Sequence, residues 1–135
     1  MKENMESNSN LYILNLKSFE WRIAPIEGDS KPQGRDDHSV ATSESSLFIF
    51  GGFVKGKRMN DLHMFTYESK TWQCLWEYQE VDEFSNPNKQ KECPCPRSGQ
   101  AMIYYDNKIY LFGGRNDYND KLNDTWIFDI TSKKW

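Results

Sequence analysis

Two aromatic-rich apolar runs, each ending in a pair of glycines, place the strongest constraint on how this chain folds. The run FIFGG ends at Gly52 and the run YLFGG ends at Gly114. A continuous apolar run of this length indicates a strand that is covered on both faces. Paired glycines let the backbone turn sharply and let another strand pass closely. The offset of 114 − 52 = 62 residues therefore favours a repeated unit made of several short strands.

The flanks of the two diglycines repeat as well. Three segments share one frame and close with a tryptophan, namely LYILNLKSFEW (11–21), NDLHMFTYESKTW (60–72) and NDTWIFDITSKKW (123–135). Upstream of the diglycines, PQGRDDHSVA (32–41) matches PCPRSGQAMI (94–103), which aligns Arg35 with Arg97. Matches at several points in a fixed order predict a repeated structural unit.

Each full unit is predicted to contain four short antiparallel strands. The expected first strands are HSVATS and GQAMIYY, the second SLFIF and KIYLF, and the third DLHMFTY and DTWIFDI, which alternate as half-covered strands do. TWQCLWEY is the expected fourth strand of the first unit, and no capped helical period exceeds two turns. The predicted fold class is therefore all-β. Because one such sheet cannot bury both of its apolar faces, its neighbours must be copies of itself arranged around an axis.

This order of residues resembles the kelch repeat, whose pattern has Arg and His before the first strand, Gly-Gly after the second, an aromatic residue in the third and then Trp. The matching residues are Arg35, His38, Gly51, Gly52, Phe65 and Trp72 in one copy, Arg97, Gln100, Gly113, Gly114, Phe128 and Trp135 in the other, and Trp21 at the end of the first segment. Gln100 departs from the pattern. The resemblance implies a partial kelch-type β-propeller of four-stranded antiparallel blades. The text NDTWIFD is closer to kelch proteins of scaffolds, GTPase effectors and cytoskeletal or ciliary assemblies than to the BTB-linked ubiquitin-ligase adaptors.

The repeat frame divides the chain into five segments. These are a polar N-terminal segment (1–10), the outer strands of a first blade with a linker (11–31), a complete kelch blade (32–78), an inserted loop (79–95) and a second blade that is truncated at its outermost strand (96–135). We expect the chain to be part of a longer protein, or residues 11–23 to be a strand pair that closes a ring. In either case, remaining blades or another chain must cover the open blade faces.

Composition excludes several classes of function. The net charge of −3 and the pI of 5.4 argue against a general nucleic-acid surface. No stretch is apolar enough to insert into a membrane, and the first ten residues lack the apolar core of a secretory signal. Because three cysteines cannot all pair and no export signal is present, a cytoplasmic location is expected, and an association with the cytoskeleton is compatible with it.

Basic residues gather in the two loops that join the second strand of each unit to the third. Lys55, Lys57 and Arg58 lie in one loop, and Arg115-Asn116 directly follows the second diglycine. In kelch proteins that bind acidic peptides, an Arg-Asn placed there lies on the binding face, and a guanidinium holds a carboxylate through two parallel hydrogen bonds. These residues therefore form either a site for an acidic protein or peptide segment, or ordinary solvated surface.

The sequence predicts no catalytic residues, no metal site and no cofactor. His38 occupies a repeat position and is assigned a structural role at the rim of a blade, and Cys93 and Cys95 form no recognised zinc spacing. The function predicted from the sequence is a non-catalytic protein-interaction module or scaffold that presents loops to a partner. Two alternatives stay open, namely a fragment of a kelch-propeller enzyme whose active site lies outside this chain, and a structural subunit of a large assembly.

Overall fold

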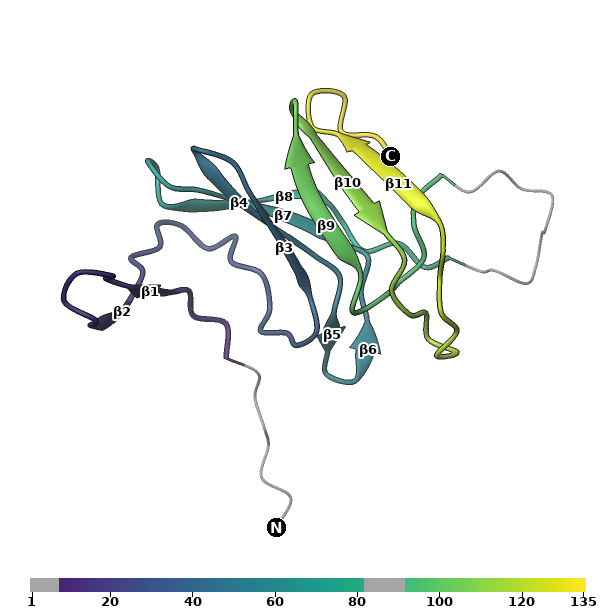
Figure 1. Ribbon diagram of the computed structural model, residues 1–135, viewed down its shortest axis with the longest axis horizontal. Coiled ribbons are helices and arrows are strands. Elements are labelled where there is room, and N and C mark those ends of the chain that lie inside the picture. The colour runs from purple at the N-terminus through teal and green to yellow at the C-terminus, as the bar shows by residue number, and fades with distance from the viewer. Residues whose placement is uncertain (1–7, 82–91) are drawn as a thin grey trace, which may run out of the picture.

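The computed structural model describes residues 8–81 and 92–135, and all regular structure in these ranges is β-strand (Figure 1). In chain order the strands are β1 (Tyr12–Leu14), β2 (Trp21–Ile23), β3 (Ser39–Thr42), β4 (Ser46–Phe50), β5 (Phe53–Val54), β6 (Lys57–Arg58), β7 (Leu62–Thr66), β8 (Thr71–Trp76), β9 (Ala101–Tyr105), β10 (Lys108–Phe112) and β11 (Thr125–Asp129). The all-β prediction is confirmed. The division of the chain into five segments stays a prediction.

The first full repeat forms a four-stranded antiparallel sheet with the order β3-β4-β7-β8, which we call the first sheet. The second repeat forms the three-stranded antiparallel sheet β9-β10-β11, which we call the second sheet. After β11 the chain turns at Lys133, whose φ is 53°, and Lys134 bridges back to Asp129. The first sheet turns in the same way before β8, at Lys70 with a φ of 57°. Lys134 thus pairs with the end of β11 as Thr71, the first residue of β8, pairs with the end of β7 in the first sheet.

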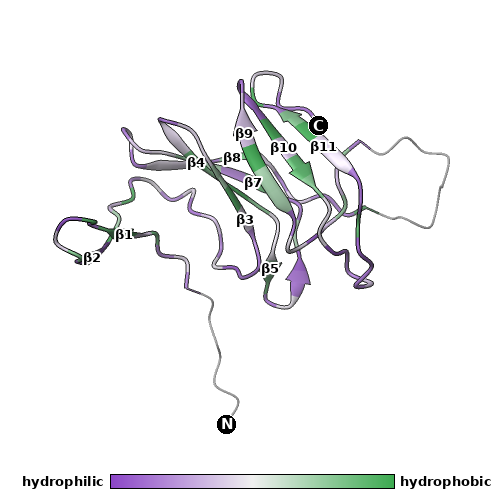
Figure 2. Cartoon of the chain, in the orientation of Figure 1, coloured by the Kyte–Doolittle hydropathy of each residue, from purple (hydrophilic) through white to green (hydrophobic). Residues whose placement is uncertain are grey.

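A short hairpin, β5–β6, stands in the connection between β4 and β7, where the sequence indicated only a loop. Lys55 and Gly56 form its turn with φ values of 51° and 81°. A two-residue turn with both φ angles positive matches the twist of an antiparallel pair. Its second strand, β6, is the hydrophilic arrow at the lower end of the sheets in Figure 2.

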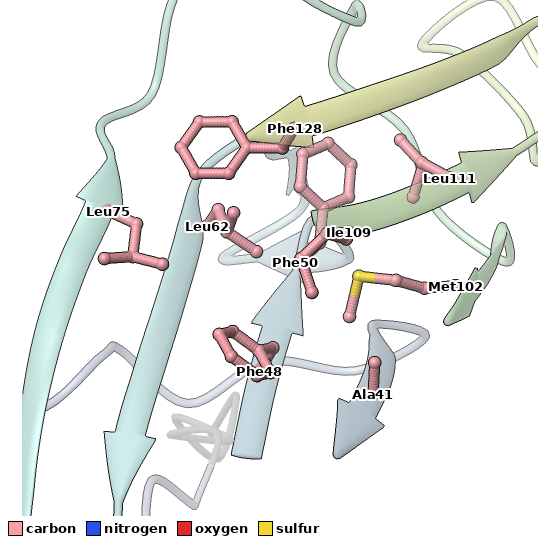
Figure 3. Close-up of a cluster of buried hydrophobic side chains, with 9 residues drawn as sticks. All are labelled: Ala41, Phe48, Phe50, Leu62, Leu75, Met102, Ile109, Leu111 and Phe128. Carbon is pink, nitrogen blue, oxygen red and sulfur yellow. The ribbon is translucent and has the colours of Figure 1, made fainter. Parts of the chain in front are cut away.

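The two sheets pack face to face and share one hydrophobic core (Figure 3). Alternate residues of each strand point into this seam, as strand geometry requires. The buried members are Ala41, Phe48, Phe50, Leu62 and Leu75 from the first sheet and Met102, Ile109, Leu111 and Phe128 from the second. Phe48 stacks on Tyr104 across the seam, with ring centroids 5.4 Å apart and planes 8° apart. The two runs that end in diglycines therefore lie in different sheets.

The tryptophans that close the repeats cover the face of their own sheet. The ring of Trp72 lies 5.2 Å from the ring of Phe65, and Trp135 lies 5.1 Å from Phe128. Trp135 also reaches across the seam and meets Phe50 edge-on, with centroids 5.3 Å apart. Trp21 in β2 is exposed, because β1 and β2 pair only with each other.

The structure shows why each of the two strands β4 and β10 is followed by a pair of glycines. Gly51 and Gly52 have φ values of 63° and 85°, and Gly113 and Gly114 have φ values of 66° and 91°. A Cβ on Gly52 would lie 2.5 Å from the carbonyl oxygen of Asp36. Only glycine combines this torsion with this close approach of a neighbouring backbone.

Candidate functional site

A buried ion pair fixes the end of the first sheet from which the loops project. Arg35 donates to both carboxylate oxygens of Asp61, over 2.7 and 2.8 Å, and to the backbone carbonyl of Gly51 over 3.0 Å. His63 Nε2 adds a third bond to the carboxylate, over 2.8 Å. Burial opposes the charge on Asp61, but the hydrogen bonds from Arg35 and His63 outweigh it and lower the pKa of this carboxyl to about 2. We call this arrangement the Arg–Asp clamp.

The second sheet repeats the clamp. Arg97 donates to both carboxylate oxygens of Asp124, over 2.7 and 2.8 Å, and to the carbonyl of Gly113 over 3.0 Å. Trp126 Nε1 takes the place of His63 and donates to Asp124 over 2.6 Å. Despite burial, the hydrogen bonds from Arg97 and Trp126 lower the pKa of Asp124, and the pairing raises the pKa of Arg97. Each Arg therefore locks the start of its repeat to the residues before its third strand.

Sequence reasoning singled out Arg35 and Arg97 but missed their carboxylate partners. The signal was present, because an aspartate recurs at a nearly constant distance from each arginine, 61 − 35 = 26 and 124 − 97 = 27 residues.

Asn60, which precedes Asp61, holds the connection between the two sheets. The buried side chain of Asn60 bonds the backbone of Gln79 twice, over 2.9 and 3.0 Å, and the carbonyl of Pro94 over 2.9 Å, and so pins both ends of the blade-to-blade connection.

Gln100, which stands where the repeat pattern has histidine, forms a hydrogen bond across the seam. Its Nε2 donates to the backbone carbonyl of Phe50 over 2.9 Å. The backbone adds two bonds at the same place, from Gly52 N to Arg97 O and from Arg97 N to Met59 O, each 3.0 Å long. His38 occupies the equivalent position in the first sheet and is exposed.

Two of the basic residues predicted to bind a partner, Arg58 and Lys57, contact other side chains of this chain. Arg58 donates to the hydroxyl of Ser98 over 3.1 Å, lies 3.9 Å from the carboxylate of Asp117 and stacks over Phe53 with 4.4 Å to the ring centroid. Lys57 places its ammonium 4.4 Å from the ring centroid of Tyr78. A hydrogen bond to Tyr78 outweighs the effect of desolvation and raises the pKa of Lys57. Arg58 thus joins the two sheets.

The Arg115-Asn116 pair separates into an exposed and a buried residue. Arg115 is exposed and donates to Asn119 over 3.3 Å, while its backbone pairs with Ser98. Asn116 is buried, and its side-chain oxygen accepts the backbone amides of Tyr118 and Asp120 over 3.1 and 2.9 Å. Asn116 therefore shapes its own loop, and Arg115 is the member of the pair that faces solvent.

Between these elements lies a hollow of about 520 Å³. Its lining comes from three separate connections and combines aromatic, apolar and charged side chains: Lys57, Tyr78, Glu80, Val81, Cys95, Pro96, Asn116, Asp117 and Tyr118. Figure 1 shows the β5–β6 hairpin and the loop that follows β10 at the same end of the sheets. Residues 82–91 of the predicted inserted loop lie outside the described residues. We call the end of the sheets that carries this hollow the loop end.

Metal-binding groups and membrane-spanning helices are absent from the part of the chain that the structure describes. Within residues 8–81 and 92–135, no group of three His, Cys, Asp or Glu side chains is placed to hold a metal ion. The same ranges contain no helix long and apolar enough to cross a membrane. His63 is buried against Asp61, so it belongs to the clamp.

Comparison with known proteins agrees with the two repeated sheets, their diglycines and their clamps. A family described as the KLHDC2/KLHL20/DRC7 Kelch-repeats domain matches residues 1–135. The chain belongs to the kelch-repeat family. The two sheets are consecutive blades of a partial kelch β-propeller.

Three kelch relatives show how far the likeness extends. Tip elongation aberrant protein 3 from Schizosaccharomyces pombe is 29% identical over 145 residues, which cover 95% of this chain and 13% of that protein. Kelch domain-containing protein 1 from Mus musculus is 31% identical and Kelch domain-containing protein 2 from Bos taurus is 30% identical, each over 129 residues that cover 95% of this chain and 29% of the relative. The chain thus spans less than a third of the length of each of these relatives.

Proposed function

We propose that this chain is a non-catalytic interaction module whose loop end binds a protein or peptide partner. The observation that carries the proposal is the hollow lined by three connections, one from each blade and one between them. Its two tyrosines, Tyr78 and Tyr118, offer ring surface at low entropic cost, and charged side chains of both signs surround them. Kelch-repeat proteins generally bind protein partners through such modules and are typically non-enzymatic, which supports this function.

The proposal of an acidic partner segment rests on Lys55, Lys57 and Arg115. Lys55 is exposed at the tip of the β5–β6 turn, and Arg115 is exposed on the neighbouring loop. Arg58 contributes to the rigidity of the surface, since it is paired with Asp117. A carboxylate on the partner would meet these cations, and added salt would weaken that contact. A cytoplasmic or cytoskeletal site of action is likewise proposed.

Affinity capture with charge-reversal variants tests the function. We expect Arg115→Glu to lose a partner that the wild-type chain retains, and Tyr118→Ser to weaken the same partner by removing ring contact at the hollow. Lys17→Glu is the matched control, because Lys17 is exposed on the β1–β2 hairpin away from the loop end. If Arg115→Glu and Tyr118→Ser leave all partners in place, the loop end is not the binding surface.

A further inference from the structure

The guanidinium of Arg58 lies between the β5–β6 hairpin and the second repeat. Its Nε donates to the hydroxyl of Ser98 over 3.1 Å, and its Nη1 lies 3.9 Å from the carboxylate of Asp117. The group lies over the ring of Phe53, its cross-strand partner in the hairpin. A planar fork with several donors can hold two acceptors at once in this way. One side chain of the first repeat therefore contacts two residues of the second.

Both residues that Arg58 contacts are connected to the charged groups of the loop end. Ser98 exchanges two backbone hydrogen bonds with Arg115, of 2.9 and 3.0 Å. Asp117 lines the hollow, as does Lys57, which precedes Arg58 in the chain. The position of the Arg58 guanidinium is therefore linked to the positions of Lys57, Arg115 and Asp117.

Arg58 and Ser98 lie behind the surface that a partner would touch. The side chain of Arg58 is only 12% exposed, and Ser98 is only 2% exposed. Arg115, in contrast, is exposed. A buried group acts on a partner through the residues that it holds, because a recognition group that is displaced by about 1 Å loses much of its contact.

We propose that Arg58 is a positioning residue of the loop end. It holds the β5–β6 hairpin at a fixed distance from the loop that follows β10, and so sets the spacing of the charged groups that a partner must match. The charge of Arg58 then serves contacts within the chain, and Arg115 meets the partner. This inference rests on the proposed function, because it concerns the same surface.

Hydrogen exchange of the 135-residue chain tests the positioning without a partner. Arg58→Lys keeps the positive charge, but a compact ammonium lacks the fork that holds two acceptors, and Ser98→Ala removes one of these acceptors. We expect each variant to reduce the protection of the Arg115 amide by about 10-fold and to leave the Ile109 amide in β10 within about 2-fold of the wild type. Ser46→Ala is the matched control, because Ser46 is a buried serine at the opposite end of β4 from the diglycine, and both amides should keep their protection.

Affinity capture then connects the positioning to the function. The readout is the protein that the wild-type chain retains and Arg115→Glu loses. We expect Arg58→Lys and Ser98→Ala each to weaken its retention by about 10-fold, although the first variant conserves the charge and the second changes a buried residue. Ser46→Ala should retain this protein as the wild type does. If Arg58 were a direct cationic contact, Arg58→Lys would stay close to the wild type and Ser98→Ala would have no effect.

The possible results separate this inference from the proposed function. Unchanged protection of the Arg115 amide in both variants overturns the positioning role, and so does an equal loss at Arg115 and Ile109, which would indicate a general loss of stability. If both variants retain the partner that Arg115→Glu loses, the inference fails and the proposed function stands. If Arg115→Glu and Tyr118→Ser lose no partner, the proposed function fails, and the exchange measurement alone decides whether Arg58 holds the loop.

Discussion

Replacing Asp61 by asparagine removes the charge at the centre of the first Arg–Asp clamp. The side chains of Arg35 and Asp61 are only 4% and 8% exposed, and two hydrogen bonds of 2.7 and 2.8 Å join them. An asparagine of the same shape leaves the guanidinium of Arg35 buried without its counter-charge. Removing one partner of a buried pair costs about 3–5 kcal/mol, which is a large part of the total stability of a small domain.

The pKa of Asp61 gives an independent magnitude. It is lowered from 3.8 to about 2, which corresponds to a stabilisation of about 2 kcal/mol at neutral pH. Because the pKa is lower in the folded state, this stabilisation is fully present above the unfolded value of 3.8. It is lost as the pH falls from 3.8 through about 2, where the folded protein also becomes protonated.

Urea denaturation followed by tryptophan fluorescence measures both quantities. We expect Asp61→Asn to lower the free energy of unfolding by about 3–5 kcal/mol at neutral pH and to flatten its decline between about pH 4 and pH 2. Asp29→Asn is the matched control, because Asp29 is exposed on the linker before β3, and it should behave as the wild type does. An Asp61→Asn variant within about 1 kcal/mol of the wild type at neutral pH would refute the role assigned to the clamp.

Three further substitutions test the backbone and the seam. Gly52→Ala should cost about 3 kcal/mol or more and Gly56→Ala only about 1 kcal/mol in chemical denaturation, because φ is positive at both but only Gly52 has backbone within contact distance; equal losses would contradict this. Gln100→Leu should cost about 1 kcal/mol in calorimetry by removing the hydrogen bond from Gln100 to the Phe50 carbonyl, whereas Gln100→His should retain most stability; an unchanged Gln100→Leu would contradict it. Trp135→Ala should cost about 3 kcal/mol by thermal unfolding, and a loss near zero would remove Trp135 from the core.

The sequence was most informative about strands because their apolar runs have a period and a length that can be read directly. The second strands SLFIF and KIYLF appear in the structure with the same limits, as β4 and β10. The sharp turn at Gly51-Gly52 could also be predicted, since few other features require two consecutive glycines after a strand. Trp72 and Trp135 could be placed on the faces of their sheets because they recur in register.

Contacts between distant residues were harder to predict. The Arg35–Asp61 pair joins positions 26 residues apart that only the folded sheet brings together. The sequence made Arg58 a candidate for partner binding, yet it contacts Ser98 and Asp117 in the next repeat. Asn116 was expected on the surface, but its side chain is turned inward to hold its loop. Hydrogen-bond geometry of this kind depends on tertiary packing, and only the recurrence of Asp61 and Asp124 at a similar distance from each arginine marked the clamps in the sequence.

The central claim is that the two repeats are separate sheets that pack against each other face to face. Nuclear Overhauser effects between the ring protons of Phe48 and Tyr104 test it most directly, because these rings belong to β4 and β9 and stack 5.4 Å apart. We predict strong cross-peaks between them in the folded chain. A folded sample in which both sheets are formed but no cross-peak joins these two rings would contradict the account.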